Sequence, residues 1–116
     1  MGDRANILIK ERTTDSGIYL YTHWRGTELP KTLQRALRKK WRWDDPPYLT
    51  RIIFSEMIDG EEKEETGFGI STRETDGMNR VLTVNCENLL ISFNEKIWTF
   101  HQYIALSEEE IKTVWD

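Results

Sequence analysis

A histidine, a tryptophan and an arginine stand together at the end of a strand-like run, and their types suit ligand binding. The apolar run at residues 17–21 continues into Thr-His-Trp-Arg-Gly-Thr at 22–27, and a helical pattern follows. His23 supplies an imidazole, Trp24 a flat ring, and Arg25 a cation that can bind phosphate or carboxylate through two hydrogen bonds. A helix N-terminus close by favours an anion, because its first amides are free.

The same junction has a purely structural interpretation, which the sequence leaves open. Trp24 could pack against the following helix, His23 could hydrogen-bond a backbone carbonyl, and Arg25 could be solvated.

A second group of cations and indoles occurs at residues 39–45, Lys-Lys-Trp-Arg-Trp-Asp-Asp. Single-stranded nucleic acid is bound by such mixtures of cations and stacking rings. Two acids follow at once, however, there is no RNA-binding signature, and the whole chain has a net charge of −4, so we do not predict a nucleic-acid partner. In the structural alternative, Trp41 is a core residue and Trp43 covers the turn between two helices.

We predict that the strand end and this turn form one rim that binds an anionic small molecule such as a nucleotide. The predicted ligand-binding residues are Arg4, His23, Trp24, Arg25, Arg42, Trp43 and Asp44. The two groups lie at opposite ends of the helix expected between them, roughly 18 Å apart at about 1.5 Å per residue, which counts against a single pocket. Long side chains or a homodimer that brings the two ends together remain open alternatives.

The charge distribution supports a second function class, a protein-interaction or inhibitor module. Residues 31–42 contain no acid and the following cations: Lys31, Arg35, Arg38, Lys39, Lys40 and Arg42. We expect a solvated helix face, which an acidic partner protein could cover. The acidic stretch 59–65 is expected to be a solvated loop.

Catalytic and metal-binding patterns are weak. A hydrolase with His23 as general base is a third open alternative, and it requires a carboxylate that orients the imidazole. Cys86 has no neighbouring base in the sequence, and pairing with His23 or His101 would depend on the fold. Asp45 is best explained as a helix cap, so we predict no metal site, no cofactor and no assigned catalytic residue.

The composition is that of one soluble domain spanning residues 1–116, with 38% hydrophobic and 31% charged residues. No window has the roughly 18 apolar residues of a membrane-spanning helix. The first residues lack the apolar core of a secretory signal, and a single cysteine excludes an intramolecular disulfide. We therefore expect a cytoplasmic protein with no membrane partner.

The periodicity predicts strands and helices in the order β-β-α-α-β-β-β-β-α. Expected strands are 6–11, 17–21, 67–72, 80–85, 89–94 and 97–105, and expected helices are 29–41, 46–60 and 107–115. Because the helices are grouped, the fold class is α+β: an antiparallel sheet with two central helices packed on one face and a short C-terminal helix. Leu33, Leu37, Ile52, Ile53 and Phe54 are expected to be mostly buried.

Four segments resemble a group of small uncharacterised proteins of bacterial and phage genomes. They are MGDRAN at 1–6, YLYTHWRGTELP at 19–30, RWDDPPYLTRIIFSEM at 42–57 and ETGFGIST at 65–72. The resemblance implies a small cytoplasmic protein, carried in some cases by a phage and acting on a host molecule. It implies no activity, cofactor or residue role.

Overall fold

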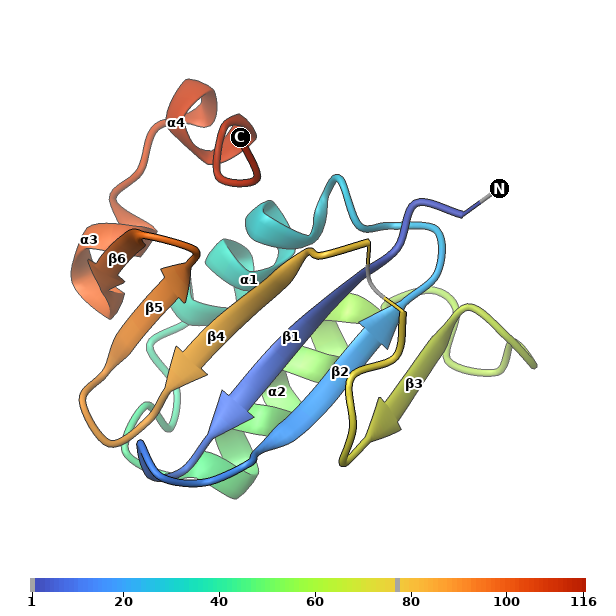
Figure 1. The fold of residues 1–116 in the computed structure, drawn as a ribbon, viewed down its shortest axis with the longest axis horizontal. Helices are drawn as coiled ribbons and strands as arrows, with labels where there is room; N and C mark the ends of the chain where they lie inside the picture. The colour runs from blue at the N-terminus through green and yellow to red at the C-terminus, as the bar shows by residue number, and fades with distance from the viewer. Residues whose placement is uncertain (1, 77) are drawn as a thin grey trace.

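A six-stranded mixed sheet forms the centre of the molecule (Figure 1). The computed structural model describes residues 2–76 and 78–116. The strands are β1 (Ala5–Lys10), β2 (Ile18–Thr22), β3 (Phe68–Ser71), β4 (Val81–Asn85), β5 (Leu90–Phe93) and β6 (Lys96–Thr99). The helices are α1 (Leu29–Arg38), α2 (Pro46–Met57), α3 (Phe100–Ile104) and α4 (Glu108–Lys112).

The strand order is β3-β2-β1-β4-β5-β6, and the central pair β1 and β4 is parallel. Each other neighbouring pair is antiparallel. The prediction of an entirely antiparallel sheet is therefore wrong at the centre. The chain passes through β2, α1, α2 and β3 between β1 and β4, and a connection of that length permits parallel pairing.

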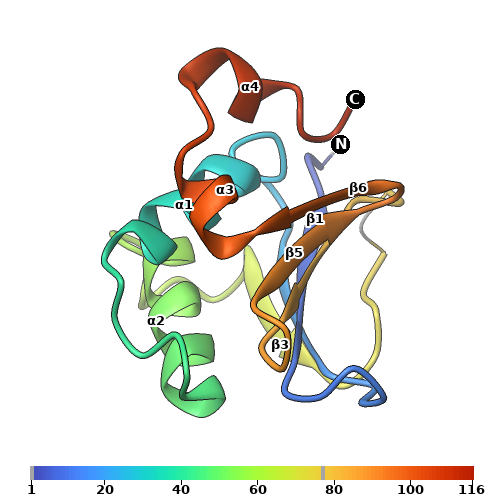
Figure 2. The same cartoon turned by 90° about the vertical axis from the view of Figure 1, so that its left-hand side faces the viewer.

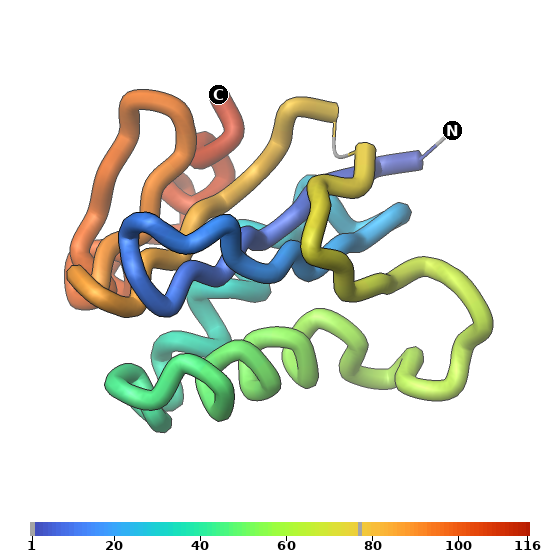
Figure 3. The backbone as a smooth tube through the Cα atoms, turned by 60° about the horizontal axis from the view of Figure 1, so that its bottom comes forward, coloured from blue at the N-terminus to red at the C-terminus, as the bar shows by residue number. Residues whose placement is uncertain are grey.

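Alternate residues of the central strands form the core under the helices. Ile7 of β1 pairs with Leu20 of β2 and with Leu82 of β4, and these side chains are fully buried. Figure 2 shows α1 and α2 on the same side of the sheet, and Figure 3 shows α2 running alongside the strands. Of the expected core residues, Leu33, Leu37, Ile52 and Ile53 are buried, whereas Phe54 is partly buried against the core.

The helix α1 ends earlier than the periodicity predicts. Its last residue is Arg38, and Lys40 adopts the left-handed backbone conformation with φ of +58°. Trp41 therefore lies outside the helix and is 59% exposed. The interpretation of Trp41 as a core residue is wrong.

The strand expected at 97–105 is also wrong in its second half. The strand β6 ends at Thr99, which caps α3: its side chain accepts a hydrogen bond from the Gln102 amide, and the Gln102 side chain accepts one from the Thr99 amide. His101 consequently lies on a helix, and not on a strand as expected. The capping box at Ser107 and Glu110 is confirmed at the start of α4.

Among the described residues, no helix has the length and apolar character needed to cross a bilayer.

Candidate functional sites at the end of β2 and at the turn between α1 and α2

The predicted rim divides into two separate places within one chain. The Trp43 ring contacts Phe100 and His101 of α3, directly after the edge strand β6. The amide of His23 instead donates to the carbonyl of Gly67, beside the opposite edge strand β3. Strands are spaced by about 4.8 Å, so the two edges of the sheet are roughly 24 Å apart. The two groups therefore lie toward opposite edges of the sheet, which counts against one rim formed by both within a single chain.

Both arginines at the end of β2 already have acidic partners. Nη1 of Arg4 lies 2.9 Å from Oδ2 of Asp76, and Nη2 of Arg25 lies 2.6 Å from Oε2 of Glu61. An anionic ligand would have to compete with these carboxylates. The contacts thus weaken the prediction that Arg4 and Arg25 bind an anion.

A side chain of the protein itself, that of Asp3, binds the turn that precedes α1. Oδ2 of Asp3 accepts a hydrogen bond from the Thr27 amide at 3.0 Å, and Oδ1 accepts one from the Thr27 hydroxyl at 2.9 Å. A Cβ atom on Gly26 would lie 2.7 Å from the Asp3 carbonyl oxygen and 2.8 Å from Nη1 of Arg80. The sequence Arg-Gly-Thr is explained by this close packing, and an external anion is not needed to explain it.

His23 has a tyrosine beside it in place of the carboxylate that a general base would use. The Tyr21 hydroxyl and Nδ1 of His23 are hydrogen-bonded at 2.7 Å. The contacts of the described residues include no carboxylate at the His23 ring. The geometry therefore gives the hydrolase hypothesis no support.

A shallow hollow of about 480 Å³ lies beside His23. Its lining residues come from the end of β2 and from the chain leading into β3; they are Tyr21, His23, Trp24, Glu65, Thr66, Gly67 and Phe68. We call this the aromatic hollow. Of the predicted site residues, it contains His23 and Trp24.

Most cations of the basic helix face hold the helices to one another. Nε of Arg35 and Nζ of Lys39 lie 3.5 Å and 3.4 Å from the carboxylate of Glu56 on α2. Nζ of Lys31 lies 2.7 Å from Glu108, and Nε of Arg38 donates to the Ile104 carbonyl at 3.0 Å. The cations of this face remain largely exposed, as expected of a solvated helix face. Their pairing with groups of the same chain nevertheless leaves fewer free charges for an acidic partner.

The predicted residues of the turn between α1 and α2 differ in their surroundings. Nε1 of Trp43 donates to the Leu37 carbonyl at 3.1 Å, so Trp43 is a packing residue, as its structural interpretation predicted. Arg42 lies 3.7 Å from Asp45 and stacks over the Tyr48 ring at 4.8 Å. Asp44 is exposed.

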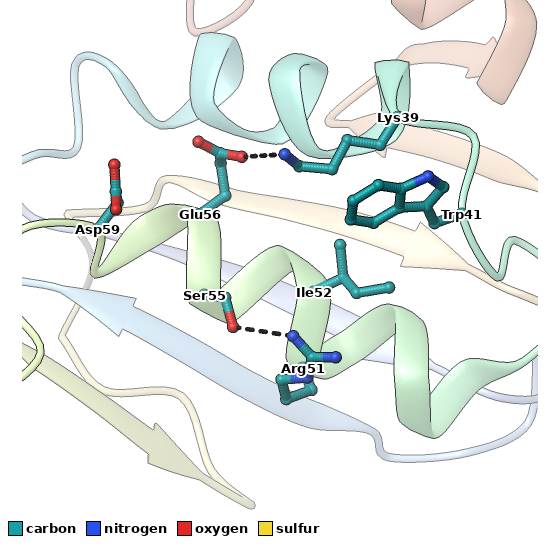
Figure 4. A pocket seen from close by; sticks show the side chains of 7 residues that line it. All are labelled: Lys39, Trp41, Arg51, Ile52, Ser55, Glu56 and Asp59. Carbon is teal, nitrogen blue, oxygen red and sulfur yellow. Dashed lines mark hydrogen bonds and ion pairs between the residues drawn. The ribbon is translucent and has the colours of Figure 1, made fainter.

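A groove of about 250 Å³ lies next to this turn, between the end of α1 and the outer side of α2 (Figure 4). Trp41 forms one wall, and the other lining residues are Lys39, Arg51, Ile52, Ser55, Glu56 and Asp59. We call this the indole groove. The sequence gives no signal for this groove, because Trp41 continues the apolar periodicity of α1, which predicted a buried side chain.

The backbone on both sides of Trp41 is strained. Lys40 and Arg42 each have φ of +58°, a conformation that costs residues other than glycine roughly 1–2 kcal/mol. Strained residues of this kind are frequent at binding sites, where they fix a side chain in place. Here they hold the Trp41 indole on the outside of the molecule.

No cluster of metal ligands accompanies these sites in residues 2–76 and 78–116. Cys86 is buried, and burial together with the nearby Glu11 carboxylate raises its pKa to about 11. A thiol with that pKa is a poor nucleophile at neutral pH. The burial and raised pKa of Cys86 therefore give no support to a catalytic cysteine.

Comparisons with family models, with curated proteins and with solved structures find no match to this chain.

Proposed function

We propose that this protein is a binding module for a small anionic ligand that carries a flat ring, such as a nucleotide, and that the ligand binds in the indole groove. The observation that carries the proposal is the exposed Trp41 ring, held outward between two residues in the left-handed conformation. An indole that served only the fold would be expected to pack inward, as Trp43 does.

The groove offers an anionic group at least one loosely held cation. Nη1 of Arg51 is 3.4 Å from the Ser55 hydroxyl, a long contact that leaves most of the guanidinium free. Nζ of Lys39 lies 5.2 Å from the centre of the Trp41 ring and shares Glu56 with Arg35. In this proposal the ring of the ligand stacks on Trp41 while its phosphate or carboxylate binds Arg51 and Lys39.

The acidic residues of the groove favour a ligand that also carries hydrogen-bond donors. Asp59 lies at the end of the groove away from Trp41, and its carboxylate can accept hydrogen bonds from amino or hydroxyl groups (Figure 4). Nucleotides combine a ring, a phosphate and such donors. A simple inorganic anion offers none of the ring contacts and is expected to bind weakly.

A thermal-shift screen of nucleotides, followed by calorimetric titration of the best one, tests this proposal. Trp41→Ala and Arg51→Gln should each weaken binding about tenfold or more, since stacking and charged hydrogen bonds each contribute on the order of 1–3 kcal/mol. The matched controls are Trp24→Ala, which removes an indole that is 54% exposed, and Arg73→Gln, which removes another exposed arginine. Equal affinities in all four variants, or no stabilisation by any nucleotide, would refute the proposal.

A further inference from the structure

The aromatic hollow beside His23 is built from rings that meet edge to face. Trp24 contacts His23 at 4.8 Å between ring centres and an angle of 84°, and His23 contacts Tyr21 at 6.1 Å and 64°. Phe68 adds a fourth aromatic side chain to the lining. These rings therefore lie at steep angles to one another around the hollow, and the Trp24 side chain is 54% exposed.

The shape of this hollow is fixed by the backbone. Gly67 has φ of +106°, and a Cβ atom there would lie 3.0 Å from the Trp24 ring. The Gly67 carbonyl also accepts the His23 amide at 2.9 Å. Glycine suits this position, because φ of +106° strains any residue with a side chain and a Cβ atom would press on the indole.

The electrostatic surroundings favour a cation. Glu65 is the charged residue in the lining, whereas Arg25 and Arg4 beside the hollow are paired with Glu61 and Asp76. The preceding chain, residues 59–65, has the sequence Asp-Gly-Glu-Glu-Lys-Glu-Glu and is strongly acidic. Acids concentrated on one loop attract cations to the adjoining surface.

We propose that the aromatic hollow binds a methylated ammonium group. The faces of tryptophan, tyrosine and phenylalanine attract cations, and aromatic cages are the usual recognition sites of quaternary ammonium and methylated lysine. An unmethylated ammonium is strongly hydrated and needs several oxygen ligands, whereas the hollow offers one carboxylate and few hydroxyls. The methyl groups lower this desolvation cost and fit the apolar walls.

This site is separate from the indole groove, and its ligand has the opposite charge. The lining residues of the two sites do not overlap. The methylated ammonium group could come from two sources: a free quaternary amine or a trimethylated lysine of another protein. An experiment that refutes the proposal for one site therefore leaves the proposal for the other site unaffected.

Titration of the ¹⁵N-labelled protein with choline, followed by NMR, tests the cation requirement. Choline should shift the Trp24 indole and Gly67 amide resonances in a saturable manner. The uncharged analogue 3,3-dimethylbutan-1-ol has nearly the same shape and should bind about tenfold more weakly, because it lacks the attraction between cation and ring. Equal binding of the two compounds, or no shift at these resonances, would overturn the proposal.

Variants separate this site from the indole groove. Trp24→Ala should abolish the choline-induced shift at the Gly67 amide, Trp24→Phe should retain part of it, and Glu65→Gln should weaken binding a few fold. Trp41→Ala, which removes an equally exposed indole, should leave choline binding unchanged; an equal loss in Trp41→Ala would contradict the assignment. The Glu65→Gln result and the comparison with the uncharged analogue remain decisive even if Trp24→Ala disturbs the fold.

A second titration identifies the source of the ligand. A peptide with trimethyllysine should bind about tenfold more tightly than choline if the natural ligand is a protein side chain. Tighter binding of choline assigns the site to a free amine, and either ranking supports recognition of methylated ammonium. Absence of binding by both compounds refutes it.

Discussion

Oδ1 of Asp3 and Nη1 of Arg80 lie 2.6 Å apart, although the two residues are separated by 77 positions in the sequence. The same Asp3 carboxylate accepts hydrogen bonds from the amide and hydroxyl of Thr27. One side chain thus joins the segment before β1, the turn before α1 and the segment before β4.

The stability of the protein should therefore depend on the ionisation of Asp3. Burial tends to raise the pKa of Asp3, but the Thr27 amide, the Arg80 guanidinium and the Thr27 hydroxyl together lower it below the ordinary 3.8. A lowered folded-state pKa stabilises the protein above the unfolded-state pKa, and this stability is lost as pH falls through the folded-state value. Urea unfolding of the wild type and of Asp3→Asn should show a stability difference at pH 7 that shrinks below about pH 4. A difference independent of pH would contradict this account.

Glu56 should contribute to stability through the cations of α1. Its side chain is only 16% exposed and lies within 3.5 Å of both Arg35 and Lys39. Replacing Arg35 and Lys39 together by glutamine should lower the free energy of unfolding by about 1–2 kcal/mol, at the upper end for surface pairs because one shared carboxylate loses both partners. Glu109→Gln on the exposed side of α4 is the control and should have almost no effect. Chemical denaturation measures both.

Lys40→Gly should stabilise the protein. Lys40 has φ of +58°, and glycine adopts this conformation without steric cost, although it loses more backbone entropy on folding. The net gain should be about 0.5–1 kcal/mol. Thermal denaturation checks the direction, and a lower melting temperature would show that the left-handed backbone at residue 40 is not strained.

Cys86 should react slowly with thiol reagents in the folded protein. Its pKa is raised to about 11 by burial and by Glu11, so little thiolate is present at pH 8. Ellman's reagent should modify Cys86 rapidly only after unfolding in urea. Fast reaction of the native protein would indicate an accessible thiolate.

Ile53 should be a major contributor to the core. Its side chain is fully buried between α2 and the sheet, and Ile53→Ala should cost about 2–5 kcal/mol through the cavity it leaves. Ile70 on the edge strand β3 is 60% exposed and provides a matched control. Ile70→Ala should change the unfolding free energy by less than about 0.5 kcal/mol.

Periodicity and capping signals predicted most of the secondary structure. The apolar stripe through Leu33 and Leu37 and the capping box at Ser107 depend on neighbours within a few residues, and the structure contains both. The parallel pairing of β1 with β4 depends instead on which edge of β1 is free after β2 has paired. The alternation of apolar and polar residues within a strand does not indicate which strand pairs with its free edge.

The two sites were harder to predict because they depend on packing between distant segments. The partner of Arg25 is Glu61, from an acidic loop that the sequence indicated only as solvated. Phe100 to Ile104 alternates well enough for a strand, but the capping box between Thr99 and Gln102 starts a helix there. The outward position of Trp41 depends on the left-handed backbone conformation of Lys40 and Arg42. Lysine and arginine rarely adopt this conformation, so the sequence did not predict it.

The central position of β1 has a consequence for synthesis of the chain on the ribosome. β1 is complete at residue 10, but the partner for its second edge, β4, begins at Val81. At about 5–20 residues per second, that edge stays unpaired for roughly 4–15 s after β1 is made. An unpaired edge on a strand as apolar as Ala5–Lys10 can pair with other chains. The nascent chain is therefore most exposed to aggregation before β4 emerges.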